Sequence, residues 1–203
     1  ASRPIRILLA DEIDRYPATA GNEGDPLLLA GKRLATFWNK KEVCVSTPTN
    51  KETSRIAVEF EHSTQEEWNV PCPACGAFTP LLWANIVFDR DKLDEIGCTC
   101  PACGVVSSET EWKEQYINGK FVAAHPERKV RGFHLNALAS LFVDWREIVE
   151  KFLTANEEKK KGNIELLKVW TNTEMGETWE EDGEQIETDD LYKRREKYNC
   201  EVP

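Results

Sequence analysis

Two short hydrophobic runs near the start of the chain each end in a cluster of polar residues. The first run, 5–10, reads Ile-Arg-Ile-Leu-Leu-Ala and ends at Asp11 and Glu12. The second run, 43–45, ends at the segment 46–49, which reads Ser-Thr-Pro-Thr. Short apolar runs bounded by polar residues are typical of strands in a parallel sheet. Both runs are therefore predicted to be buried strands.

A helix is predicted between these two strands. Asp25 is a favoured N-cap residue, and Pro26 is favoured at the first position of a helix. We expect this helix to extend from Leu27 to Trp38. A strand, a helix and a strand in this order form a βαβ unit, in which the two strands are parallel.

The pattern changes along the rest of the chain. Residues 68–106 form short β-prone pieces around four cysteines, and Asp144 and Glu147 have the spacing of a capping box at the start of a helix. Gly176 is expected to end a helix over 163–173. The other expected elements are a short helix over 52–63, a helix over 109–118, and extended segments over 119–123 and 129–136.

The composition is that of a globular protein, and the length fits one domain, or one main domain with a small additional domain. The 203 residues are 40% hydrophobic, and no run approaches the roughly 18 apolar residues of a membrane span. A cytoplasmic protein is therefore expected. The formal net charge is -10, whereas proteins that only hold DNA usually present a basic face. Any contact with DNA is expected to come from local basic patches or from parts of a larger protein.

Four of the seven cysteines form two Cys-Pro-Ala-Cys-Gly motifs, at Cys72 and Cys75 and at Cys100 and Cys103. Zn²⁺ favours four thiolates in a tetrahedron, and each Cys-x-x-Cys turn supplies two of them. The four cysteines therefore predict a closed, structural zinc site. The alternatives are two redox pairs or unrelated buried cysteines. Cys98 is a possible substitute for Cys100, but only Cys100 keeps the x-x spacing, and the remaining Cys44 and Cys200 are expected to be free thiols.

The acids at the end of the first strand match the Walker B pattern of P-loop ATPases. In that pattern Asp11 holds Mg²⁺ through its water shell, and Glu12 polarises the attacking water. Ser46, Thr47 and Thr49 follow the neighbouring strand, where hydroxyl groups can sense the γ-phosphate, because ligands bind at the carboxyl ends of parallel strands. The alternative is an ordinary strand end that is acidic by chance. The sequence has no G-x-x-x-x-G-K-[ST] loop, so either the protein is not an ATPase or the chain begins after that loop.

The same residues resemble a known family. The stretch from Asp11 to Pro17, the segment 46–49 and the two cysteine motifs are similar to the large terminase subunit of lambda-type tailed phages. So are Gly-Phe-His-Leu-Asn at 132–136 and Asn-Thr-x-x-Gly-Glu-x-Trp-Glu at 172–180, and the likeness follows the family's order along nearly the whole chain. His134, within this set, is interpreted as a packed or hydrogen-bonded residue rather than a ligand.

The resemblance implies an α/β fold. It would contain part of a P-loop (ASCE-type) parallel sheet, an inserted zinc-ribbon-like β subdomain and C-terminal helices. The expected divisions are 1–66 for the later half of the ATPase core, 67–107 for the zinc ribbon, 108–179 for a segment that completes or flanks the ATPase, and 180–203 for a charged linker toward a nuclease domain.

The resemblance also implies a function. In this family an ATPase drives viral DNA into an empty capsid and a nuclease cuts the DNA, so the implied cofactors are ATP, Mg²⁺ and a structural Zn²⁺. Asp11 and Glu12 would be the catalytic carboxylates, and the segment 46–49 the coupling motif. Implied partners are double-stranded DNA, the small terminase subunit, the portal of the procapsid and other copies in a ring, with no membrane, in the host cytoplasm.

By itself this fragment is expected to be inactive, because the phosphate loop would lie upstream of residue 1 and the nuclease carboxylates beyond Pro203. Two alternatives remain open at this point. One is a non-catalytic zinc-ribbon module that binds a protein partner or nucleic acid, and the other is a P-loop helicase of another kind.

Overall fold

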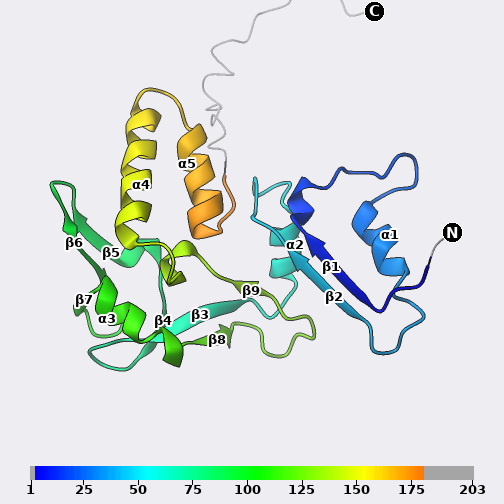
Figure 1. Ribbon diagram of the computed structural model, residues 1–203, viewed down its shortest axis with the longest axis horizontal. Coiled ribbons are helices and arrows are strands. Elements are labelled where there is room, and N and C mark those ends of the chain that lie inside the picture. Colours follow the sequence, from blue (N-terminus) through cyan, green and yellow to red (C-terminus); the bar gives the residue numbers. More distant parts are fainter. Residues whose placement is uncertain (1–2, 181–203) are drawn as a thin grey trace, which may run out of the picture.

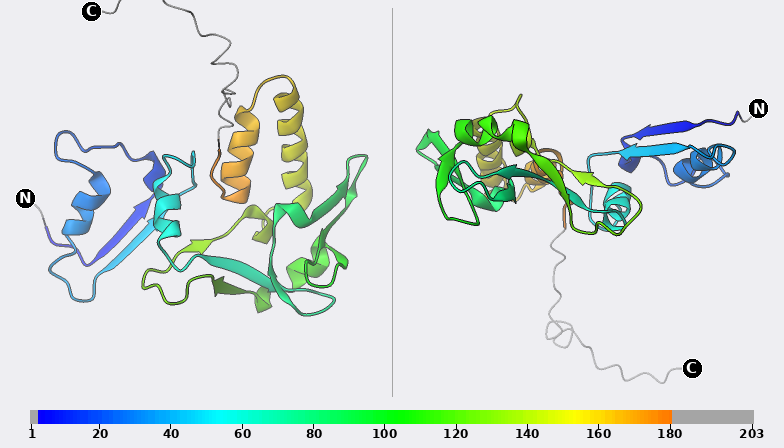
Figure 2. Two further views of the ribbon diagram at one scale, coloured as in Figure 1. Left: turned by 180° about the vertical axis from the view of Figure 1, so that it is seen from behind. Right: turned by 90° about the horizontal axis from the view of Figure 1, so that it is seen from below.

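The computed structural model describes residues 3–180, and the chain folds into two adjoining parts (Figure 1). The smaller part holds β1, β2, α1 and α2, and the larger part holds the remaining strands and helices. Figure 2 shows the two parts from behind and from below, where they lie side by side. The linker predicted over 180–203, apart from Glu180, lies outside the described residues, as does Cys200. No described helix has the length and apolar character that crossing a membrane requires.

The smaller part contains the predicted βαβ unit. Strand β1 (Ile7–Asp11) pairs in parallel with β2 (Lys41–Val45), and Asp11 lies opposite Val45 in the register. Helix α1 (Pro26–Lys32) connects them, and the carboxylate of Asp25 accepts hydrogen bonds from the N–H groups of the second and third helical residues. The predicted N-cap and the parallel pairing are both confirmed.

Two predictions for this part are wrong. The strands are not buried: Leu9 is 73% exposed and Val45 is 56% exposed, because the described part of this sheet has only two strands. The helix ends at Lys32 rather than at Trp38, which is exposed. After Lys32 the chain turns back toward the sheet, and the N–H of Ile5 donates to the carbonyl of Arg33.

The larger part contains two further sheets. In one, β3 pairs antiparallel with β4 and β8 and in parallel with β9; in the other, β5, β6 and β7 pair antiparallel in that order. The bounds are β3 Glu66–Pro71, β4 Phe78–Pro80, β5 Ile86–Asp89, β6 Lys92–Thr99, β7 Val106–Ser108, β8 Lys120–Ala123 and β9 Phe133–His134. The helices of the larger part are α3 Glu109–Glu114, α4 Trp145–Lys160 and α5 Glu165–Trp170, whereas α2 Arg55–Glu61 belongs to the smaller part.

The predicted helix over 109–118 is interrupted. α3 ends at Glu114, and a short 3-10 turn follows at Tyr116–Asn118. The predicted helix end at Gly176 is confirmed, since α5 runs into a π-helical turn that closes there with a left-handed backbone, φ 66°.

The predicted capping box of α4 does not form. Asp144 occupies the N-cap position, but its side chain makes no capping hydrogen bond. The carboxylate of Glu109, from α3, accepts the N–H of Trp145 at 2.9 Å instead. Lys113 holds that carboxylate in place with an ion pair of 2.6 Å. The N-terminus of α4 is therefore capped by Glu109 of α3 and not by Asp144, which the spacing in the sequence predicted as the cap.

One hydrophobic core fills the larger part. It runs from Val70 to Met175 and includes the buried side chains of Trp112, Trp145 and Trp170. Each of these indole N–H groups donates to a main-chain carbonyl, so burial leaves none of them unpaired. Because the core joins the cysteine motifs to α4 and α5, the larger part is packed as one unit.

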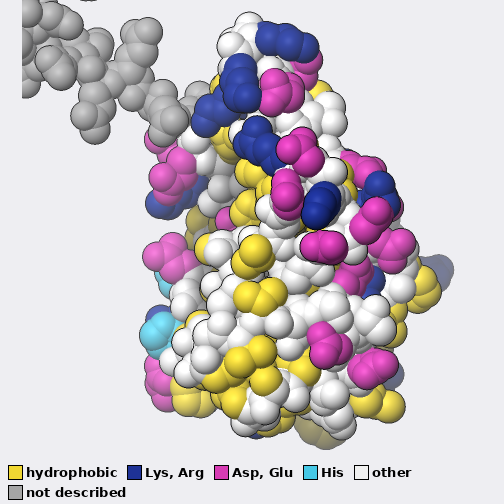
Figure 3. All heavy atoms as spheres, turned by 90° about the vertical axis from the view of Figure 1, so that its left-hand side faces the viewer, with side chains coloured by type: hydrophobic (Ala, Val, Ile, Leu, Met, Phe, Trp, Pro, Cys, Tyr) yellow, Lys and Arg dark blue, Asp and Glu magenta, His cyan; other side chains and the backbone are white. Residues whose placement is uncertain are grey.

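The surface over α4 and the sheet β5–β7 is mixed in charge. Figure 3 shows Lys, Arg, Asp and Glu side chains interspersed over the upper part of this face, and hydrophobic side chains gathered lower down. Val87, Val105 and Val106, from the strands of this sheet and the turn before β7, are about half exposed. This face carries no basic stripe of the kind that binds a phosphate backbone.

Candidate functional site

The four cysteines of the two motifs meet at one point. Cys72, Cys75, Cys100 and Cys103 place their sulfur atoms within 4.8 Å of one another. The Sγ atoms of Cys72 and Cys103 are 3.9 Å apart, as are those of Cys75 and Cys100. Zn–S bonds of about 2.3 Å in a tetrahedron place sulfur atoms about 3.8 Å apart. The donor set and its spacing therefore fit a four-thiolate metal ion.

The two motifs adopt the same turn. In the first, the N–H of Gly76 donates to the carbonyl of Cys72 at 2.9 Å, and in the second the N–H of Gly104 donates to the carbonyl of Cys100 at 2.8 Å. Both glycines have a left-handed backbone, with φ of 73° and 75°, which glycine adopts without steric cost. The first motif lies between β3 and β4 and the second between β6 and β7, so each sheet supplies two sulfur atoms.

Cys98 is close to the cluster but is not one of its members. Its thiol is buried, and burial, aided by the nearby Cys100 and Cys72, raises its pKa to about 12. Cys100 differs: although burial opposes its ionisation, hydrogen bonds from the backbone N–H groups of Cys103 and Ala102 lower its pKa. Cys44 lies in β2, outside the cluster, and the six cysteines in the described part of the chain are free thiols.

The second candidate site is the edge where β1 and β2 end. Because the two strands are parallel and in register at Asp11 and Val45, the acids after β1 and the hydroxyl residues after β2 meet at the same edge. Glu12 has a left-handed backbone (φ 53°), which is uncommon for a residue with a side chain. Asp11 and Glu12 are both exposed, so their carboxylates are accessible to a ligand.

Few contacts occupy the two predicted catalytic carboxylates. Oδ1 of Asp11 accepts the N–H of Glu12 at 3.0 Å. Oε2 of Glu12 lies 3.8 Å from Nε of Arg15, and both of these side chains are at least half exposed, so the pair is weak.

Asp14 connects the two strand ends, and the sequence pattern did not identify it. Its N–H donates to Oγ of Ser46 at 3.1 Å, and its Oδ2 accepts the hydroxyl of Thr49 at 3.0 Å. Its Oδ1 accepts the N–H of Ile56, in the first turn of α2, at 2.8 Å. The only sequence signal was its place in Asp-Glu-Ile-Asp, three residues after Asp11.

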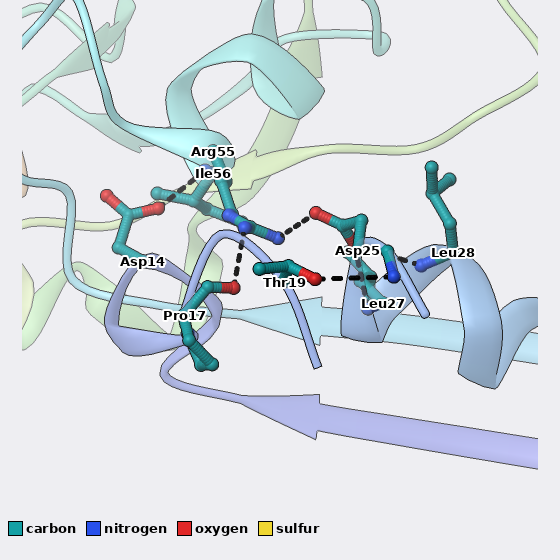
Figure 4. A network of polar contacts seen from close by, with 9 residues as sticks. Asp14, Pro17, Thr19, Asp25, Leu27, Leu28, Arg55 and Ile56 are labelled. Carbon is teal, nitrogen blue, oxygen red and sulfur yellow. Dashed lines mark hydrogen bonds and ion pairs between the residues drawn. The ribbon is translucent and has the colours of Figure 1, made fainter. Parts of the chain in front are cut away.

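Arg55 extends this polar network to α1 (Figure 4). Its Nη1 is paired with Oδ2 of Asp25 at 2.5 Å, and its Nη2 donates to the carbonyl of Pro17 at 3.0 Å. The Asp25 carboxylate thus caps α1 and holds α2 at once. The backbone N–H of Leu28 is the main cause of the lowered pKa of Asp25.

The main chain after Thr49 is paired with the end of the described chain. The N–H of Trp179 donates to the carbonyl of Thr49 at 3.0 Å, and the N–H of Lys51 donates to the carbonyl of Trp179 at 2.9 Å. Lys51 and Glu180 also form an ion pair. The two parts of the molecule are therefore joined directly beside the candidate site.

His134 is hydrogen-bonded through both ring nitrogens, which agrees with its prediction as a packed or hydrogen-bonded residue. Nδ1 is 2.8 Å from Oε2 of Glu67, and Nε2 is 2.9 Å from the carbonyl of Met175. Both partners are acceptors, which favours the ring with a proton on each nitrogen. Burial lowers the pKa of His134, but Glu67 and the Met175 carbonyl outweigh it and raise the pKa overall.

Comparison with known proteins connects this geometry to a family. The family model "Phage terminase large subunit gpA, ATPase domain" matches residues 1–121, and "Terminase large subunit gpA, endonuclease domain" matches residues 130–203. The first match ends within β8 and the second begins before β9, and both of these strands pair with β3. No solved structure matches the chain.

Two curated relatives cover nearly the whole chain. The terminase large subunit of Enterobacteria phage P21 is 25% identical over 99% of this chain, and that of Escherichia phage lambda is 26% identical over 95%. The chain spans about a third of the length of either relative, at 34% and 33%. Since the ATPase-domain model matches more than half of the chain, the chain belongs to the family of the phage terminase large subunit gpA.

Proposed function

We propose that this chain works as part of a terminase large subunit, an ATP-driven motor that packages double-stranded DNA into procapsids. It would supply the later part of the ATPase domain and the first part of the endonuclease domain. The observation that carries the proposal is the shared edge of β1 and β2, where two accessible acids follow one strand and a segment of hydroxyl residues follows the other. This edge lies within the span matched by the ATPase-domain model.

The exposed apolar side chains of the two strands support a larger P-loop sheet. Ile7, Leu9, Val43 and Val45 are 45–73% exposed, although strands of parallel sheets are usually covered on both faces. In the complete motor, further strands and helices would cover these side chains. The predicted P-loop architecture is therefore part of the proposal.

The roles follow from the chemistry of the side chains. Asp11 would hold the water shell of Mg²⁺, and Glu12 would accept a proton from the attacking water. Ser46, Thr47 and Thr49 would sense the γ-phosphate and pass its loss to the parts that move DNA. Bound ATP and Mg²⁺ supply the phosphoryl group and the charge neutralisation for the reaction.

The four-cysteine cluster would hold a structural Zn²⁺. Four thiolates leave no position for water or substrate, so its role would be to clamp the two sheets of the larger part. The small terminase subunit, the portal of the procapsid and other copies in a ring are the proposed partners, in the host cytoplasm.

A direct test uses a protein in which this chain is joined to an N-terminal phosphate-loop segment. We expect Mg²⁺-dependent ATP hydrolysis in this protein. Glu12→Gln should lower kcat by roughly 10²- to 10⁴-fold, the usual range for loss of a general base. Glu23→Gln, at an exposed acid in the loop before α1, is the matched control and should leave turnover near that of the parent. Unchanged turnover in Glu12→Gln would refute the role of Glu12.

A further inference from the structure

Asp14 differs from the two acids before it in what surrounds it. Asp11 and Glu12 are exposed, whereas Asp14 is half-buried in the 3-10 turn Ile13–Arg15 that follows β1. Both of its carboxylate oxygens accept hydrogen bonds, one from the Thr49 hydroxyl and one from the N–H of Ile56. These donors come from outside its own turn. The carboxylate is therefore committed to holding other segments and is poorly placed to bind a metal or move a proton.

The segment that Asp14 holds has no regular structure of its own. Residues 46–49 lie in neither a helix nor a strand. Three features fix them beside the end of β1: the bond from the Asp14 N–H to Ser46, the bond from Thr49 to the Asp14 carboxylate, and the burial of Pro48. Of these, the two bonds that cross between the strand ends both involve Asp14.

The same carboxylate also fixes the start of α2. The N–H of Ile56 is one of the first N–H groups of this helix, which have no partner within it. Ser54 caps the helix at the N–H of Ala57, and Asp14 takes the N–H of Ile56. Figure 4 shows the Asp14 carboxylate directed at Ile56 in the first turn of α2, and the Arg55 side chain of the same turn directed at Pro17 and Asp25.

We propose that Asp14 is a positioning residue of the ATPase site, which holds the segment 46–49 at a fixed place relative to Glu12. The inference rests on the proposed function, and Asp14 acts in it through Thr49 and Ser46 rather than on the substrate. Because the carbonyl of Thr49 is paired with the N–H of Trp179, the position set by Asp14 also reaches the segment that matches the endonuclease-domain model.

The hydroxyl of Thr49 gives the sharpest test. Thr49→Val keeps the shape of the side chain but removes the donor, and Thr49→Ser keeps the donor. In the protein joined to a phosphate loop, Thr49→Val should lower kcat by roughly 10- to 100-fold, since small misplacements at a reacting centre have effects of this order. The KM for ATP should change by less than about twofold, because the bond from the Thr49 hydroxyl to Asp14 positions the segment 46–49 for turnover and is not a contact to the nucleotide. Thr49→Ser should recover most of the turnover, and Thr53→Val, at an exposed threonine in the same loop, is the matched control.

Asp14 itself is tested with two substitutions. Asp14→Ala removes both bonds, whereas Asp14→Asn keeps an oxygen for the N–H of Ile56 and offers an N–H₂ to the Thr49 hydroxyl. We expect Asp14→Ala to lower kcat as Thr49→Val does, and Asp14→Asn to recover a large part of it. The double variant Asp14→Ala with Thr49→Val should be no worse than Asp14→Ala alone, because Asp14→Ala already removes the acceptor of the Thr49 hydroxyl.

Hydrogen exchange on residues 1–203 alone separates this inference from the proposed function. In Thr49→Val the amides of Lys51 and Trp179 should exchange faster than in the parent, with no change in Thr53→Val.

If Glu12→Gln abolishes turnover but Thr49→Val and Asp14→Ala do not lower kcat, the positioning role is overturned and the proposed function stands. Equal losses in Thr49→Ser and Thr49→Val would also overturn it, because the hydroxyl would then not be the group that matters. If Glu12→Gln leaves turnover intact, the proposed function fails. Unchanged exchange at the Lys51 amide in Thr49→Val would overturn the positioning role of the Thr49–Asp14 bond, whatever the turnover.

Discussion

Removal of the proposed zinc ion should weaken the larger part of the molecule as a whole. The four sulfur atoms lie on turns from two different sheets, and Cys72 and Cys100 belong to the core that includes α4 and α5. Loss of the metal would therefore release both sheets from each other and loosen the helices packed on them. Cys75→Ser is the informative variant, because Cys75 is exposed and its replacement barely changes packing.

The expected magnitude follows from the closed four-thiolate geometry. Structural zinc contributes about 10–16 kcal/mol of apparent binding free energy in zinc-finger peptides at neutral pH, comparable with the whole stability of a domain, about 5–15 kcal/mol. Even when free zinc is only about 1,000-fold above its Kd, binding stabilises the folded state by about 4 kcal/mol. At about 2–4 °C per kcal/mol for a chain of this size, chelation should lower Tm by roughly 8–16 °C.

The assay combines metal content with thermal unfolding under reducing conditions. We expect about one zinc per chain in the parent, a large loss of zinc in Cys75→Ser, and a Tm for this variant close to that of the chelated parent. Tryptophan fluorescence should change with the metal, because Trp112 donates to the carbonyl of Cys98 beside the cluster. Cys44→Ser, at a thiol in β2 outside the cluster, is the control and should keep its zinc. A folded, reduced and zinc-free parent whose Tm does not respond to chelation would refute the structural role.

Three smaller predictions concern the packing around the site. Gly132→Ala should lower the free energy of unfolding, measured by denaturant titration, by about 1–3 kcal/mol, because its new methyl group would lie 2.0 Å from the hydroxyl of Ser63. Gly31→Ala, inside α1, should be neutral or stabilising. Glu109→Ala should cost about 1 kcal/mol by removing the acceptor for the first N–H of α4, and Asp144→Ala should have little effect; a larger effect at Asp144 would contradict this assignment. The pKa of His134 is raised, so its contribution to the free energy of unfolding should be complete below the unfolded-state pKa of about 6.5 and should be lost as the pH rises through the folded-state pKa. NMR titration of the ring and unfolding curves across that window test it, and a folded-state pKa below that of the unfolded chain would show that the sign is wrong.

Local patterns were sufficient for the elements that depend on neighbouring residues. The Asp25 N-cap, the turn at Gly176 and the turns of the two cysteine motifs were predictable, because each depends on residues a few positions apart in the sequence. The parallel pairing of β1 and β2 was predictable from the order strand, helix, strand. The members of the four-cysteine cluster were identifiable for the same reason, since the spacing within each motif already places two sulfur atoms together.

Tertiary structure decided the features that depend on which segments meet. The first N–H of α4, that of Trp145, is capped by Glu109 rather than by Asp144, because α3 packs beside the start of α4 and places the Glu109 carboxylate on this N–H. The role of Asp14 depends on partners 35 and 42 residues away, which no local pattern specifies. The exposure of Leu9 and Val45 was equally unpredictable, because a hydrophobic strand is buried only when other elements cover it. The sequence by itself therefore determined the members of the cysteine cluster and the acidic strand end, and the folded chain decided which side chains hold that strand end in place.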